Sequence, residues 1–69
     1  STEEKAVLKY LQENRGQTTQ SNIAHIKNMG GVKAMRTVQK LEQKKIVSIE
    51  KMGKARIIKL SSDFTHIFE

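Results

Sequence analysis

The chain has 69 residues, no cysteine and a formal net charge of +6. This length allows one domain, residues 1–69, and lies near the lower limit for a self-sufficient hydrophobic core. The missing cysteines exclude disulfides, cysteine-based zinc sites and thiol catalysis. No apolar run reaches membrane-spanning length and no stretch resembles a signal peptide. We therefore expect a cytoplasmic protein, associated with the nucleoid if the source is prokaryotic.

The first sixteen residues, STEEKAVLKYLQENRG, predict a helix. Ser1 or Thr2 can cap its start, and Gly16 is the expected stop. Three acids, Glu3, Glu4 and Glu13, are interpreted as solvated helix charges. The apolar side chains expected on or beside its inner face are Val7, Leu8, Tyr10 and Leu11.

A short strand and a second helix are predicted next. The β-branched segment QTT predicts a brief edge strand, after which Thr19 or a neighbour caps a helix over QSNIAHIKNMGG. Ile23 and Ile26 should face inward. Gly30 and Gly31 are expected to end this helix and to permit a sharp turn.

The third predicted helix, roughly Val32 to Lys45, carries two stripes. Its cations recur at steps of three, four and four and fall within an arc of roughly 80°, with Thr37 at the edge of that arc. These cations are Lys33, Arg36, Lys40 and Lys44. The apolar stripe, which should face the core, contains Ala34, Val38 and Leu41.

The period changes after the third helix. Apolar, mostly β-branched residues flank a glycine-containing turn at residues 51–54, which predicts a β-hairpin. This turn is also cationic, through Lys51, Lys54 and Arg56. The last nine residues, SSDFTHIFE, predict a short capped helix that carries Phe64, Ile67 and Phe68 on one face.

The positive charge is concentrated in the second half of the chain. Residues 1–26 carry three basic and three acidic side chains, whereas residues 27–59 carry ten basic and two acidic ones. A basic stripe on one helix is also typical of an ordinary solvated face. A second cationic element favours a polyanionic partner, because like charges cost stability unless something external neutralises them.

Two segments, GQTTQSNIAHI and VQKLEQKKIVSIEKMGKARIIKLS, resemble the winged-helix DNA-binding family, especially small prokaryotic and archaeal regulators of the MarR and ArsR kind. The second segment has the family's order of a helix ending in Leu-Glu, a bend, a paired-apolar strand, a basic wing and a return strand. The resemblance covers roughly residues 5–61. The chain departs from the family at Lys45, where glycine is common, and at the looser turn NMGG.

The resemblance implies an α+β fold, a small winged helix-turn-helix with three helices, a hairpin wing and a short C-terminal helix. Residues 32–45 would be the recognition helix in the DNA major groove, and residues 51–56 would be the wing on the adjacent minor groove or backbone. The predicted DNA-binding residues are Lys33, Arg36, Thr37, Lys40, Lys44, Lys51, Lys54 and Arg56.

The expected function is sequence-specific binding of double-stranded DNA by a transcriptional regulator that acts through promoter occupancy. Two alternatives are a winged-helix protein-interaction module and a non-specific nucleic-acid coating protein. We expect a homodimer with residues 61–69 at or near the interface; in the alternative, their apolar face docks on the chain's own first helix. His25 and His66 belong to no metal-like cluster, and no catalytic motif is present. We therefore expect no enzyme activity, metal, cofactor or small-molecule ligand.

Overall fold

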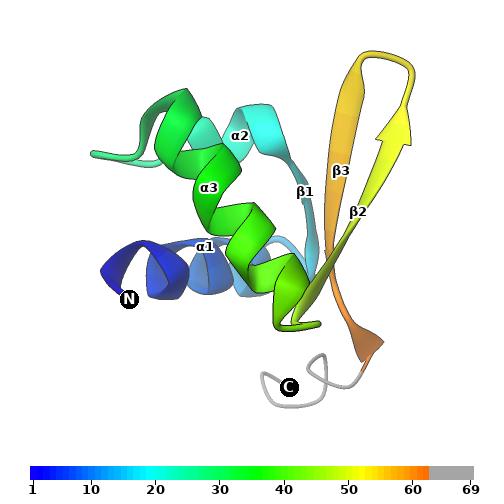
Figure 1. Cartoon of the computed structure of the whole chain (residues 1–69), viewed down its shortest axis with the longest axis horizontal. Helices are drawn as coiled ribbons and strands as arrows, with labels where there is room; N and C mark the ends of the chain where they lie inside the picture. Colours follow the sequence, from blue (N-terminus) through cyan, green and yellow to red (C-terminus); the bar gives the residue numbers. More distant parts are fainter. Residues whose placement is uncertain (63–69) are drawn as a thin grey trace.

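The computed structural model describes residues 1–62, which form an α+β domain (Figure 1). Within these residues three helices accompany a three-stranded antiparallel sheet. The elements are α1 (Thr2–Glu13), β1 (Gln17–Thr19), α2 (Gln20–Ala24), α3 (Gly30–Gln43), β2 (Val47–Met52) and β3 (Ala55–Leu60). The predicted order of elements over this part of the chain is confirmed. The predicted C-terminal helix, with Phe64, Ile67 and Phe68, lies outside the described residues.

A capping box starts α1. The Ser1 hydroxyl accepts a 3.2 Å hydrogen bond from the Glu4 amide, and the Glu4 carboxylate accepts a 3.0 Å hydrogen bond from the Ser1 amino group. This arrangement satisfies donors that the helix leaves free at its first turn. The prediction that Ser1 or Thr2 caps the helix is confirmed, with Ser1 as the cap.

Both long helices end in the same way. In α1 the residue after the C-cap is Arg15, with φ 60°, and the Gly16 amide donates a 2.7 Å hydrogen bond to the Leu11 carbonyl. In α3 the equivalent residue is Lys45, with φ 62°, and the Ile46 amide bonds the carbonyl of Leu41 at 3.0 Å. These are the hydrogen bonds of a Schellman motif, which usually has glycine where Arg15 and Lys45 stand.

The predicted edge strand is confirmed, and Thr19 is the N-cap of the helix that follows it, as predicted. That helix, α2, is shorter than predicted. Thr19 accepts a 3.1 Å hydrogen bond from the Asn22 amide. The helix stops at Ala24, and the chain continues through turns with bonds between residues three apart, such as the 2.9 Å bond from the Met29 amide to the Ile26 carbonyl. Met29, at the end of these turns, is buried in the core.

The glycine pair lies at the start of α3 and does not end α2. Gly30 has φ +76°, a conformation that other residues adopt only with strain, and Asn28 before it has φ 66°. The predicted sharp turn is confirmed, but it runs from Asn28 through Gly30 and leads into α3. As a result α3 begins two residues before Val32, and the left-handed conformation of Lys45 ends it at Gln43.

The hairpin has a two-residue turn, Gly53-Lys54, because Met52 and Ala55 form its last pair. Gly53 has φ +62° and Lys54 does not have positive φ, as a type II′ turn requires. The sheet order is β1-β3-β2, so β3 is the central strand. Figure 1 shows the helices grouped on one side of the hairpin, whose tip projects away from α1.

The core lies between the three helices and one face of the sheet. Strand alternation puts Ile58 and Leu60 on the covered face, opposite Ile49 and Val47. The core residues are Val7, Leu11, Ile23, Met29, Ala34, Val38, Leu41, Val47, Ile58 and Leu60. The predicted inward-facing residues are confirmed, although Leu8, Tyr10 and Ile26 are only partly buried. None of the helices in residues 1–62 has the length and apolar character needed to cross a membrane.

Candidate functional site

The exposed surface of α3 points away from α1, α2 and the sheet. Its buried residues, Ala34, Thr37, Val38 and Leu41, define the inward direction. At about 100° per residue, Arg36 lies within about 30° of the opposite, outward direction, whereas Lys33 and Lys40 lie roughly 90° to one side. The cationic row is therefore mainly a flank of α3.

This flank borders the start of α1. A shallow groove of about 220 Å³ is lined there by Glu3, Lys33, Arg36, Thr37 and Lys40. The structure thus brings four of the predicted site residues together. They lie beside Glu3, which was interpreted from the sequence as a solvated charge. The three cations follow one another at steps of three and four, so they are near neighbours on the helix surface.

Thr37 does not lie on an accessible face. Its exposed fraction is 5%, and it lies at the buried edge of the groove. Its burial places Thr37 in the inward stripe, on the side of α3 against which α1 packs. The apolar positions alone did not reveal this coverage.

Lys44 has a partner inside the protein. Its ammonium group donates a 2.8 Å hydrogen bond to the Glu4 carboxylate, whose side chain is only 11% exposed. This hydrogen bond and, to a smaller extent, the one from the Ser1 amino group lower the pKa of Glu4 from 4.5 to about 2. Glu4 is therefore a buried ion-pair partner and not a solvated charge, as its capping-box position three residues after Ser1 could have indicated.

The hairpin tip carries the second group of predicted residues. Lys51 and Arg56 are paired directly across the hairpin, on the same sheet face as the core residue Ile58 but nearer the tip. Because strand residues alternate between faces, both side chains extend toward the side on which the helices pack. Lys54 lies in the turn itself.

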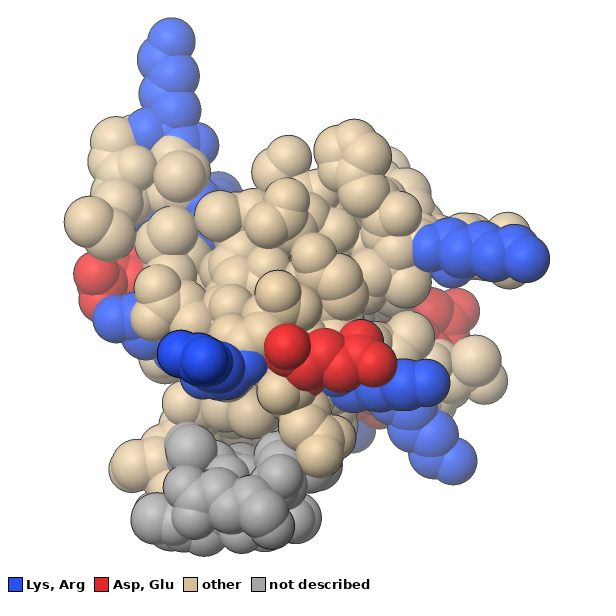
Figure 2. Space-filling view, turned by 180° about the vertical axis from the view of Figure 1, so that it is seen from behind, with Lys and Arg blue, Asp and Glu red and all other residues tan. Residues whose placement is uncertain are grey.

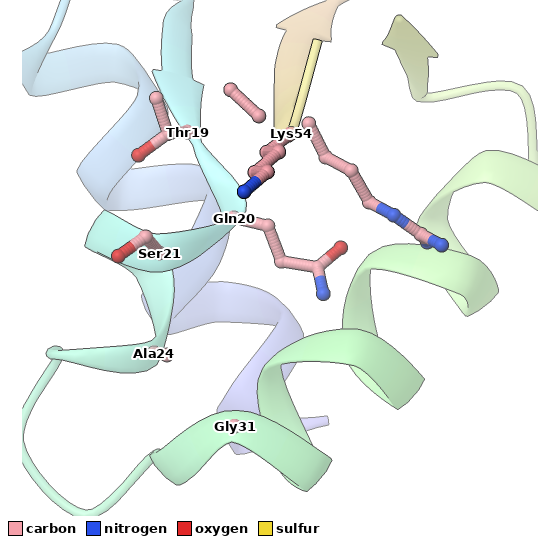
Figure 3. Close-up of a pocket in the computed structure, with 8 residues that line it drawn as sticks. Thr19, Gln20, Ser21, Ala24, Gly31 and Lys54 are labelled. Atoms are coloured by element: carbon pink, nitrogen blue, oxygen red, sulfur yellow. The ribbon is translucent and has the colours of Figure 1, made fainter. Parts of the chain in front are cut away.

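A cavity of about 390 Å³ separates the hairpin tip from the starts of α2 and α3. Figure 3 shows Lys54 directed from the hairpin toward the start of α2, with Gln20 extending across the cavity and Gly31 facing it from α3. The lining residues are Thr19, Gln20, Ser21, Ala24, Gly31, Lys54, Ala55 and Arg56. The polar α2 residues Gln20 and Ser21, adjacent to the Thr19 cap, were not among the site residues predicted from the sequence.

The arrangement of charge favours neutralisation by an external anion. Like charges directly across a hairpin, as at Lys51 and Arg56, or three to four residues apart on a helix, each cost about 0.2–1 kcal/mol. The hairpin's acid, Glu50, lies 3.5 Å from Lys59. Figure 2 shows the side opposite to that seen in Figure 1: its upper middle is uncharged, and an acidic side chain lies below the centre between basic side chains.

No group of three or more His, Cys, Asp or Glu side chains within residues 1–62 could hold a metal ion. The His25 Nδ1 atom lies 2.8 Å from the Ser21 carbonyl oxygen, and His66 lies outside the described residues. No protein-family model, curated protein or solved structure matches this chain. The functional interpretation therefore depends on geometry and charge.

Proposed function

We propose that this chain is a winged-helix protein that binds double-stranded DNA and regulates transcription by occupying a promoter. The observation that carries the proposal is that the first turn of α3 and the cationic hairpin tip border the same 390 Å³ cavity. Two basic elements that are distant in the sequence are thus neighbours in space. The cations of α3 line the separate groove next to α1, so in the proposal the duplex extends across the exposed surface of α3 to contact both elements.

The arrangement of elements supports this assignment. A short α2, a turn and the longer α3 form a helix-turn-helix pair, and the β2–β3 hairpin stands beside it. An α-helix fits the major groove of B-form DNA, so α3 is the recognition helix of the proposal. The hairpin is the wing, and it reaches the adjacent minor groove or the phosphate backbone.

The proposed contacts come from six cations. From α3 they are Lys33, Arg36 and Lys40, and from the hairpin they are Lys51, Lys54 and Arg56. Thr37 and Lys44 are left out, because Thr37 is buried and Lys44 is bonded to Glu4. If each of the six neutralises one phosphate, the logarithm of the binding constant falls with the logarithm of salt concentration with a slope of about −5.

Fluorescence anisotropy with a labelled duplex tests the proposal. Lys33→Ala/Lys40→Ala removes two charges from the proposed interface, and Lys5→Ala/Lys9→Ala removes two from the exposed surface of α1. We expect the first variant to lose affinity and to reduce the salt slope by about two units, whereas the control changes both quantities little. Equal losses in the two variants would mean that only net charge attracts the duplex.

Competition with random DNA separates a regulator from a coating protein. A regulator keeps a high-affinity site in excess competitor, with a specificity ratio of at least about 10³. A protein-interaction module shows no salt-dependent duplex affinity at all. For the regulator we expect a location in the cytoplasm, at the nucleoid in a prokaryote.

A further inference from the structure

We infer that two rows of α3 have different roles in the proposed site. An outward row contacts base pairs, including an A·T pair, and the lysines of the flank, Lys33 and Lys40, bind the phosphate backbone. The outward row consists of Val32, Arg36, Gln39 and Gln43. This inference rests on the proposed function and specifies which bases the site prefers.

The geometry of α3 separates the two rows. Steps of four, three and four along the sequence keep the outward row within about 30° of the direction opposite the buried stripe. All four of its residues are exposed, and Val32 has 60% of its surface accessible. Lys33 and Lys40 lie roughly 70–90° away, in the groove next to α1, and Arg36 of the outward row lies at the border of this groove. A helix that enters the groove with its outward face therefore presents the outward row to the bases and these lysines to the groove wall.

The chemistry of the outward row is suited to base edges. A glutamine amide bonds both N6 and N7 of adenine, an arginine bonds O6 and N7 of guanine, and an apolar side chain contacts the thymine methyl group. Lysine is a point charge without a fixed fork of donors, so it suits phosphates better. Valine also has a lower helix propensity than alanine or lysine, so helix stability gives no reason for an exposed valine at position 32.

The row also predicts the length of the site. From Val32 to Gln39 the helix rises about 10 Å, which corresponds to about three base pairs. We therefore expect a core of about three adjacent base pairs, in which Val32 contacts a thymine methyl, Arg36 a guanine and Gln39 an adenine. Gln43 lies one helical turn, about 6 Å, farther along and therefore about two base pairs beyond this core.

Selection from a random duplex pool tests the assignment of Gln39. The unmodified protein, Gln39→Ala and Lys40→Ala are compared; both positions are exposed, and circular dichroism checks that each variant is folded. We expect Gln39→Ala to lose the preference for adenine at one position, a change of about 5- to 150-fold in discrimination. Lys40→Ala should weaken all duplexes by a similar factor and leave the selected sequence unchanged.

Deoxyuridine in place of thymidine tests Val32, because it removes only the methyl group. The unmodified protein should lose affinity about fourfold at one thymine of the selected site, and Val32→Ala should not respond. Two results would overturn the inference while leaving DNA binding intact. One is a selected sequence that Gln39→Ala leaves unchanged, and the other is a base preference that Lys40→Ala abolishes. Failure of the unmodified protein to bind any duplex would overturn the proposed function as well.

Discussion

Lys44, the C-cap of α3, donates a 2.8 Å hydrogen bond to the carboxylate of Glu4 in the first turn of α1, 40 positions earlier in the chain. The acid is near the positive end of α1, and the lysine is near the negative end of α3. The same carboxylate belongs to the capping box of α1. One ion pair therefore joins the ends of the two long helices, which removes Lys44 from the proposed DNA contacts.

This ion pair predicts a dependence of stability on pH. The pKa of Glu4 is lowered to about 2, so its stabilisation is fully present above the ordinary pKa of 4.5 and is lost as the pH falls toward 2. We expect the free energy of unfolding to decrease across this window. In Glu4→Gln this part of the decrease should be absent, whereas Glu13→Gln, at an exposed position, should retain it. Denaturant unfolding at a series of pH values measures the difference, and identical profiles for Glu4→Gln and the unmodified protein would contradict it.

Lys45→Gly should stabilise the protein. Lys45 has φ 62°, a left-handed conformation that costs a residue with a Cβ atom about 1–2 kcal/mol. Glycine avoids this strain but has more freedom in the unfolded chain, so we expect a net gain of about 0.5–1 kcal/mol in the free energy of unfolding. Lys45→Ala removes the same charge and keeps the strain. Thermal unfolding of both variants separates the effects; an equal shift in both would assign the change to charge.

Lys51→Ala should raise stability while it lowers DNA affinity. Lys51 faces Arg56 directly across the hairpin, so its removal relieves a repulsion of about 0.2–1 kcal/mol. In the proposed function Lys51 also contacts a phosphate, so the salt slope should fall by about one unit. Lys9→Ala, on α1, is the control for a lost lysine. A more stable variant with an unchanged salt slope would show that the hairpin does not contact the duplex.

Thr37→Val should leave DNA binding nearly unchanged. Thr37 is 5% exposed, so its hydroxyl does not reach a duplex at the surface of α3. We expect a change in affinity below about twofold, compared with a loss of about 1–3 kcal/mol for Arg36→Ala, at an exposed position. Titration with a selected duplex compares the two variants. A large loss of discrimination in Thr37→Val would restore Thr37 to the set of base contacts.

The homodimer stays a prediction from the sequence. Phe64, Ile67 and Phe68 recur at steps of three and one, and we expect their apolar face to take part in the interface. A dimer would also read two half-sites roughly 34–36 Å apart. Sedimentation of the intact protein and of Phe64→Ala/Phe68→Ala tests this expectation. A single monomeric boundary for the intact protein at tens of micromolar would exclude the dimer.

The sequence by itself determined the types and order of the elements and most of the core. Ser1 and Thr19 cap helices as predicted, and Val38 and Leu41 are buried at their predicted helical spacing. The hairpin turn at Gly53 was also predicted. These features depend on interactions between residues at most four apart or on the conformational range of a single residue, so they can be read from short segments. The concentration of positive charge in residues 27–59 is likewise visible in the sequence itself.

The tertiary structure alone decided which side of α3 is covered. Contact with α1 buries Thr37, pairs Lys44 with Glu4 and leaves Val32 and Gln39 as the outward residues of the helix. The same periodicity is compatible with α1 on either flank of the apolar stripe. The choice between flanks depends on the packing of segments about 40 residues apart, which a local pattern does not encode.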